Sequence, residues 1–141
     1  MPRGESVSHR RTTNLRSMQP TLRCSNDFQR VYRAGKRYEG HLLTVFILPN
    51  SLTQHRLGIT ASRKALGRAV DRNRAKRLLR EAFRLTKPRL DRLKKRYDWV
   101  LNARRSLLCL GSRRPSDEFE QMIARVEREE AAGSVVEAQL V

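Results

Sequence analysis

The stretch AVDRNRAKRLLREAFR, which runs from Ala69 to Arg84, separates into an apolar and a basic face when it is wound as an α-helix at about 100° per residue. The apolar side chains fall within about one third of the circumference. They are Ala75, Leu78, Leu79, Ala82 and the following Leu85. A stripe of this width is typical of a helix that packs against a hydrophobic core. The stretch therefore predicts a helix around which the rest of the domain is arranged.

The other face of this helix carries almost only positive charge. It comprises Arg72, Asn73, Lys76, Arg77, Arg80 and Arg84. None of these side chains is acidic, so like charges repel one another at i,i+4 spacing. A polyanion along this face would relieve the repulsion, and arginine forms forked contacts with phosphate oxygens. A solvated basic face is the alternative, but the alignment of so many cations favours phosphate contact.

The charge of the whole chain also indicates a polyanionic partner. Its 141 residues include 31 Lys and Arg against 14 Asp and Glu, which gives a net charge of +17. Residues 1–116 hold 29 of the basic but only 7 of the acidic side chains, so residues 117–141 are acidic. A field of this strength attracts nucleic acid or an anionic membrane. The membrane is the weaker alternative, because the basic helix has no Trp- or Phe-rich face that could insert into lipid.

The sequence shows no targeting or membrane-spanning segment. It contains no run of about 18 apolar residues, and its polar N-terminus lacks the apolar centre of a signal peptide. Cys24 and Cys109 are the only cysteines, and neither has a second Cys or His at metal-ligand spacing. We therefore expect a cytoplasmic protein without a structural disulfide or a bound zinc ion.

The sequence also offers no catalytic residues of its own. His9, His41 and His55 are scattered, and each fits a surface or strand position better than that of a catalytic base. There is no Gly-rich phosphate loop, nucleophile motif or clustered carboxylate pair. Any reaction in which this chain takes part must draw its chemistry from elsewhere.

The residues before the basic helix predict one helix and two strands. Ser25 or Asn26 can cap a first helix, which Gly35 would end. Alternating side chains predict strands over His41–Leu48 and Arg56–Ser62, and the polar loop between them predicts a long hairpin.

The residues after the basic helix predict a third strand and a last helix. The strand covers Trp99–Ala103, and the helix is capped by Ser116. Its apolar stripe consists of Phe119, Met122, Ile123 and Val126. The order helix, strand, strand, helix, strand, helix predicts the α+β class, as a single-domain sandwich of a small central sheet with packed helices.

The predicted domain occupies residues 21–130. Residues 1–20 are rich in Arg, Ser and Thr, and we expect them to form a disordered basic extension. Residues 131–141 are expected to form a flexible C-terminal tail. Met18 stands directly before the predicted domain and is an alternative start position.

Two blocks of the sequence resemble the bacterial ribonuclease P protein family. SRKALGRAVDRNRAKRLLREAFR, from Ser62 to Arg84, is similar to the basic signature of the family, the RNR motif, in residue type and spacing. LRCSNDFQRVYRAGKR, from Leu22 to Arg37, is similar to the entry into its first helix. The resemblance extends to Val126. The basic N-terminal extension, the acidic C-terminal segment and Asn102, where the family usually has an apolar residue, depart from it.

This resemblance implies a fold, a reaction and its partners. The fold is α+β with a left-handed βαβ crossover, against the usual hand. The reaction is endonucleolytic removal of the 5′ leader from precursor tRNA by a large catalytic RNA, with Mg²⁺ held mainly by that RNA. The protein is the subunit that binds the catalytic RNA and the single-stranded leader, the latter in a cleft between the sheet and the first helix. The resemblance implies no membrane and no stable protein partner.

The resemblance assigns binding of the catalytic RNA to the basic signature. The residues are Arg63, Lys64, Arg68, Arg72, Asn73, Lys76, Arg77, Arg80 and Arg84. Charge does not explain Asn73, which either hydrogen-bonds the loop backbone at residues 67–69 or contacts a phosphate.

The leader-binding cleft is assigned to aromatic, hydroxyl and basic side chains, because single-stranded RNA is held by stacking and a basic groove. The residues are Phe28, Tyr32, Phe46, Thr60, Ser62 and Arg104. The alternative for the three aromatic side chains is a place in the hydrophobic core. The alternative function, a small basic ribosomal or RNA-chaperone protein, fits charge and size but does not require the two sequence blocks.

Overall fold

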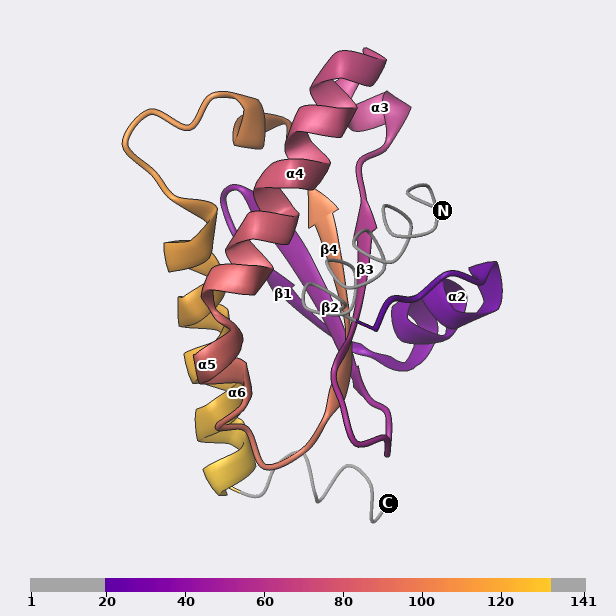
Figure 1. The fold of residues 1–141 in the computed structure, drawn as a ribbon, viewed down its shortest axis with the longest axis vertical. Helices are drawn as coiled ribbons and strands as arrows, with labels where there is room; N and C mark the ends of the chain where they lie inside the picture. The colour runs from indigo at the N-terminus through magenta and orange to yellow at the C-terminus, as the bar shows by residue number, and fades with distance from the viewer. Residues whose placement is uncertain (1–19, 133–141) are drawn as a thin grey trace, which may run out of the picture.

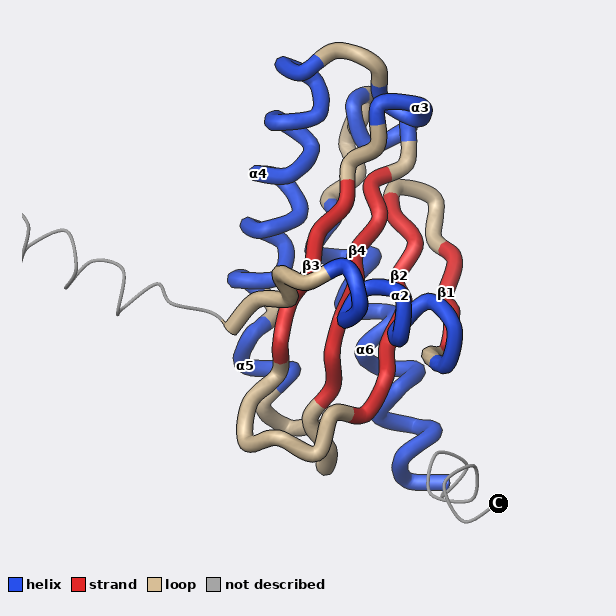
Figure 2. Tube along the Cα trace, turned by 90° about the vertical axis from the view of Figure 1, so that its right-hand side faces the viewer, coloured by secondary structure: helices blue, strands red, loops and turns tan. Residues whose placement is uncertain are grey.

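A computed structural model of the protein describes residues 20–132. The chain forms three layers, in which a four-stranded sheet lies between helix α2 on one face and helices α4 and α6 on the other (Figures 1 and 2). The predicted extension lies outside the described residues apart from residue 20, and so does the predicted tail apart from residues 131 and 132, which end α6.

The order of elements contains every predicted helix and strand. The bounds are α2 Ser25–Ala34, β1 Lys36–Glu39, β2 Leu43–Pro49, β3 Arg56–Thr60, α3 Arg63–Leu66, α4 Ala69–Leu85, α5 Lys87–Leu90, β4 Tyr97–Ala103, the 3-10 turn Arg105–Leu108 and α6 Pro115–Ala132. The sequence interpretation missed β1 and α3. β1 is four residues long, and only its Tyr38 is buried, so it has no clear apolar alternation.

The predicted hairpin between the second and third strands is wrong. The strands lie in the order β1-β2-β4-β3, so β4 separates β2 from β3. β2 is antiparallel to β1 and β4, and β3 pairs in parallel with β4. The reason is burial: six of the seven side chains of β4 are buried, so both faces of this strand are covered, which is typical of a central strand. A β2–β3 hairpin would leave β4 at an edge.

β3, α4 and β4 form a βαβ unit with a left-handed crossover. The chain leaves β3, passes through α4 and returns as the parallel neighbour β4. Seen from the α2 side with β3 running upward, β4 lies to the right of β3 while α4 lies behind the sheet (Figure 2). This is the hand that the family resemblance implies, and it is opposite to that of most such units.

The main core lies between the sheet and the α4–α6 layer. The predicted apolar stripe of α4 faces this core at Ala75, Leu78, Leu79 and Ala82. The prediction is wrong for Leu85, which is 51% exposed at the end of the helix. Phe83 is buried instead, and its ring stacks on Phe119 of α6 at 5.7 Å, because the last turn of α4 faces that helix.

The core on the opposite face, under α2, is much smaller. It consists of Leu22, Val31 and Val100, with Phe28 and Phe46 packed at its margin. Phe28 lies so close to β3 that a Cβ atom at Gly58 would be 2.7 Å from its ring, so glycine is required there. α2 therefore covers only part of the sheet, and the rest of this face is available to a ligand.

Candidate nucleic-acid interface

The basic face of α4 points away from the core. Asn73, Arg77, Arg80 and Arg84 are exposed, while Arg72 and Lys76 are half-buried. Two acidic side chains of α4 reduce the charge here. Glu81 forms an ion pair with Arg84 that lowers the pKa of the Glu81 carboxyl group, and Asp71 lies 3.5 Å from Arg68. The side chain of Asn73 makes no hydrogen bond within residues 20–132, so the predicted bond to the backbone of residues 67–69 is not formed.

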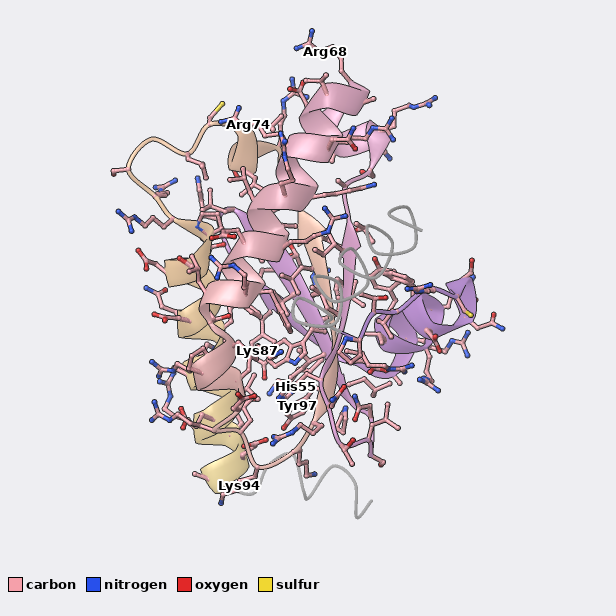
Figure 3. All side chains as sticks on the ribbon, in the orientation of Figure 1. His55, Arg68, Arg74, Lys87, Lys94 and Tyr97 are labelled. Carbon is pink, nitrogen blue, oxygen red and sulfur yellow. The ribbon has the colours of Figure 1, made fainter. Side chains whose placement is uncertain are left out.

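Further cations lie at the amino end of α4. Ser62 ends the extended segment by accepting a hydrogen bond from the backbone N–H of Ala65 at 3.1 Å, which starts α3. The predicted strand to Ser62 is therefore two residues too long. α3 and the turn that follows expose Arg63, Lys64 and Arg68. Figure 3 shows Arg68 at the upper end of the molecule and Arg74 further down α4. Arg74 is exposed although the predicted face did not include it.

A first groove, the basic groove, separates α4 from the edge strand β3. On the strand side it is lined by Leu57, Gly58 and Ile59, with Phe28 above them. On the helix side it is lined by Lys76, Arg77, Arg80, Glu81, Phe83, Arg84 and Lys87. Sequence reasoning missed Lys87, although it follows Arg84 at i+3 spacing and continues the basic face into α5.

A second hollow, the polar groove, lies above α2 on the open part of the sheet. Its floor is the row Glu39–Thr44–Asn102–Thr60, which crosses all four strands in register. The remaining lining is Tyr32, Arg37, Ser62, Ala65, Ala103, Arg104 and Arg105. Four of the predicted leader-binding residues meet here, namely Tyr32, Thr60, Ser62 and Arg104.

The other two predicted leader-binding residues lie elsewhere. Phe46 packs edge-on against Tyr32, with ring centroids 4.9 Å apart, beneath the guanidinium group of Arg37. Phe28 lines the basic groove instead of the polar groove, because residues one turn apart on α2 face different parts of the sheet. Both rings are half-buried, so neither is a fully enclosed core residue. Sequence reasoning placed Arg105 beside Arg104 at the border of this groove, where the structure has it. It missed Arg37 and Asn102, since β1 and the neighbours of β4 were not predicted.

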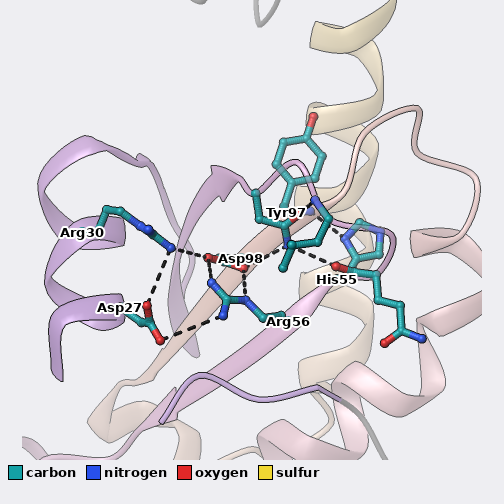
Figure 4. A network of polar contacts seen from close by, with 9 residues as sticks. Asp27, Arg30, His55, Arg56, Tyr97 and Asp98 are labelled. Atoms are coloured by element: carbon teal, nitrogen blue, oxygen red, sulfur yellow. Dashed lines mark hydrogen bonds and ion pairs between the residues drawn. The ribbon is translucent and has the colours of Figure 1, made fainter. Parts of the chain in front are cut away.

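An ion-pair network fastens α2 to the sheet (Figure 4). The buried carboxylate of Asp98 accepts hydrogen bonds from Arg56 at 2.7 and 2.8 Å, and Arg30 of α2 reaches it at 3.5 Å. Asp27 of α2 lies 3.7 Å from Arg30 and 4.0 Å from Arg56. Burial raises the pKa of Asp98, but the hydrogen bonds from Arg56 and Asn50 outweigh it, so its pKa lies below the ordinary value.

His55 is buried directly before β3, where its hydrogen bonds connect β4 to the end of α5. Its Nδ1 accepts hydrogen bonds from the backbone N–H of Tyr97 at 3.1 Å and from the indole of Trp99 at 3.0 Å. Its Nε2 lies 3.1 Å from the carbonyl of Leu90, so the proton resides on Nε2. Burial lowers the pKa of His55 and keeps the ring neutral.

The described part of the chain contains no group of three or more His, Cys, Asp or Glu side chains that could hold a metal ion. None of its helices is long and apolar enough to cross a bilayer. Cys24 and Cys109 are both exposed and unpaired with each other.

Comparisons with known proteins agree with the resemblance seen in the sequence. A family model described as Ribonuclease P matches residues 17–127. A ribonuclease P protein component of Clostridium botulinum is 42% identical over 85 residues, which cover 60% of this chain and 74% of that protein. One of Pelotomaculum thermopropionicum is 37% identical over 106 residues, which cover 75% and 91%.

Solved structures show the same similarity in three dimensions. The RNase P protein of Staphylococcus aureus superposes with a TM-score of 0.64 at 30% identity, covering 76% of this chain and 96% of that one. The RNase P protein of Thermotoga maritima superposes with a TM-score of 0.63 at 29% identity, covering 77% and 99%. The residues that line both grooves lie within residues 17–127, which the family model matches.

Proposed function

The chain belongs to the ribonuclease P protein family, and we propose that its basic α4 face binds the catalytic RNA while its polar groove binds the 5′ leader of precursor tRNA. As a member of this family it is a subunit of a ribonucleoprotein endonuclease. The alternative, a ribosomal or RNA-chaperone protein, is not favoured, because the family match extends over residues 17–127.

The shape and charge of α4 support its assignment to the catalytic RNA. The helix has 17 residues and is therefore about 25 Å long. Exposed cations continue along it from Arg68 before its first turn to Lys87 after its last. A folded RNA presents phosphates over comparable distances, and each neutralised phosphate contributes to affinity through release of bound counterions.

The side chains of the polar groove support its assignment to a single strand. Tyr32 is 38% exposed and offers a ring for stacking. Arg104 and Arg105 can neutralise phosphates, whereas Arg37 is ion-paired with Glu39. Thr60 and Asn102 supply hydrogen-bonding groups at the floor. Duplex RNA does not require such a combination, since its bases are already stacked and paired.

The proposal assigns Mg²⁺ and the activation of water mainly to the RNA. The protein contributes affinity and position, because the acidic side chains that line the two grooves, Glu39 and Glu81, are ion-paired with arginines and no histidine lies among the described lining residues. We also propose a cytoplasmic location, since precursor tRNA is the substrate.

The proposal rests above all on the polar groove, which brings Tyr32, Thr60, Ser62 and Arg104 together on the open part of the sheet. The test mixes the purified chain with ribonuclease P RNA and measures cleavage of precursor tRNA at low Mg²⁺, where the RNA alone is weak. We expect strong stimulation by this chain and none by a ribosomal protein of similar size and charge. Equal stimulation by both, or cleavage by the chain without RNA, would contradict the proposal.

A further inference from the structure

Asn102 occupies the middle of the polar groove floor. It belongs to the central strand β4, where it lies between Thr44 of β2 and Thr60 of β3. On the same face of β4, Val100 is fully buried beneath α2, whereas Asn102 is half-buried and lines the groove. An amide side chain therefore stands at the point where the sheet emerges from under α2.

Two hydroxyl groups contact the oxygen atom of this amide. The Tyr32 hydroxyl donates to Asn102 Oδ1 at 3.0 Å, and the Thr60 hydroxyl donates to the same oxygen at 2.6 Å. A carbonyl oxygen has two lone pairs, so both acceptor positions of Oδ1 are occupied. The Nδ2 group of Asn102 has no partner within residues 20–132 and keeps two N–H donors for a ligand.

This hydrogen-bonding pattern discriminates between nucleobases. The forked contact of an asparagine with adenine needs Oδ1 as an acceptor for the adenine amino group, and this oxygen is already occupied. Guanine O6 and uracil O4 are acceptors and fit an amide donor, whereas adenine and cytosine carry an amino donor at the corresponding position. Donor would then face donor, with neither group satisfied.

We propose that Asn102 selects a leader nucleotide whose base is guanine or uracil over one whose base is adenine or cytosine. The inference rests on the proposed binding of the leader in the polar groove. In this arrangement Arg104 and Arg105 neutralise the flanking phosphates, Tyr32 stacks on a base, and Asn102 contacts the edge of that base.

The test uses ribonuclease P RNA reconstituted with the full chain and a set of precursor tRNAs. Each leader position is varied in turn through the four bases, and the equilibrium affinity is measured for every substrate and for mature tRNA. At one position we expect guanine and uracil to bind about three- to tenfold more tightly than adenine and cytosine, the effect of one neutral hydrogen bond.

Two variants of Asn102 separate the effect of its hydrogen-bond donors from its effect on the fold. Asn102→Val keeps a residue that favours strands but removes the donors, so the preference should disappear. Asn102→Asp keeps the shape and both hydroxyl bonds but replaces the donor group by an acceptor, so the preference should reverse toward adenine and cytosine. Asn26→Asp adds the same charge on the exposed first turn of α2 and should leave the preference unchanged.

The outcomes distinguish this inference from the proposed function. Equal binding of all four bases, or an unchanged preference in Asn102→Val and Asn102→Asp, would overturn the role of Asn102 while precursor still binds better than mature tRNA. If the wild-type complex bound precursor tRNA no more tightly than mature tRNA, the proposed binding of the leader itself would be overturned. A preference that disappears in one variant and reverses in the other supports the inference.

Discussion

Arg56 and Asp98 form a two-pronged ion pair between directly opposite residues of the parallel strands β3 and β4. Asp98 is fully buried, and Arg30 of α2 reaches the same carboxylate. One buried carboxylate thus connects the edge strand, the central strand and the helix that borders the polar groove.

Asp98→Asn should destabilise the fold and weaken leader binding. The change keeps the shape of the side chain but removes the charge that satisfies Arg56, which we expect to cost about 1–3 kcal/mol of unfolding free energy. α2 should then be held less firmly, so the affinity ratio of precursor to mature tRNA should fall. Urea unfolding and tRNA titration measure the two effects.

The matched control is Asp91→Asn, an identical change at an exposed position. Its unfolding free energy should stay within about 0.5 kcal/mol of the wild type. Equal stability of the two variants would show that the Asp98 network does not hold α2.

The stability of the protein should decrease as the pH falls from about 7 to 5. Burial lowers the pKa of His55 from its ordinary value of 6.5, so the unfolded chain takes up a proton in a range where the folded chain does not. The stability that the neutral His55 ring contributes is fully present above pH 6.5 and is lost progressively as the pH falls below that value. Fluorescence of Trp99, the only tryptophan and a hydrogen-bond donor to His55, reports unfolding at each pH.

His55→Asn provides the comparison, because the asparagine oxygen can accept the bonds that Nδ1 accepts but does not titrate. Its stability should be nearly independent of pH in this range. His41→Asn, at an exposed position, should keep the wild-type dependence. The pH dependence would have another source if it persisted in His55→Asn.

Arg77→Ala and Arg80→Ala should each weaken binding to the catalytic RNA without affecting the fold. Both side chains are exposed on α4, and each lost phosphate contact should cost about 1–3 kcal/mol. The slope of log affinity against log salt should become shallower by about one unit per variant. Arg128→Ala, at an exposed position on α6, is the control and should change neither affinity nor slope.

Tyr32→Ala and Phe46→Ala should weaken binding of precursor tRNA and leave assembly with the catalytic RNA unchanged. Loss of the base stacked on Tyr32 should cost about 1–3 kcal/mol, and Phe46→Ala acts on the same contact by removing the ring that supports Tyr32. Leu52→Ala removes an exposed apolar side chain outside both grooves and serves as the control. Unfolding of the two variants, detected by circular dichroism, would show that these rings are core residues. Intact folding with unchanged precursor affinity would place the leader elsewhere.

The sequence by itself determined the helices and the chemistry of their faces. The spacing of Ala75, Leu79 and Ala82 identified the buried side of α4, and the arginines between them identified its exposed side. Helical periodicity arises from residues within a few positions of each other, so it can be recognised without knowledge of the fold. The predicted N-caps were wrong, because α2 begins after Cys24, with Ser25 and Asn26 inside the helix, and Ser116 lies inside α6.

Only the tertiary structure decided which strands are neighbours and therefore which side chains share a groove. The hydroxyl of Tyr32 meets Asn102 across 70 positions, and Thr60 meets it across 42. This meeting depends on the insertion of β4 between β2 and β3, which no local pattern specifies. Strand order is set by the burial of whole faces against distant elements, such as the packing of Trp99 of β4 against Phe119 of α6. The alternation of side chains within one strand carries no information about which strand will be its partner.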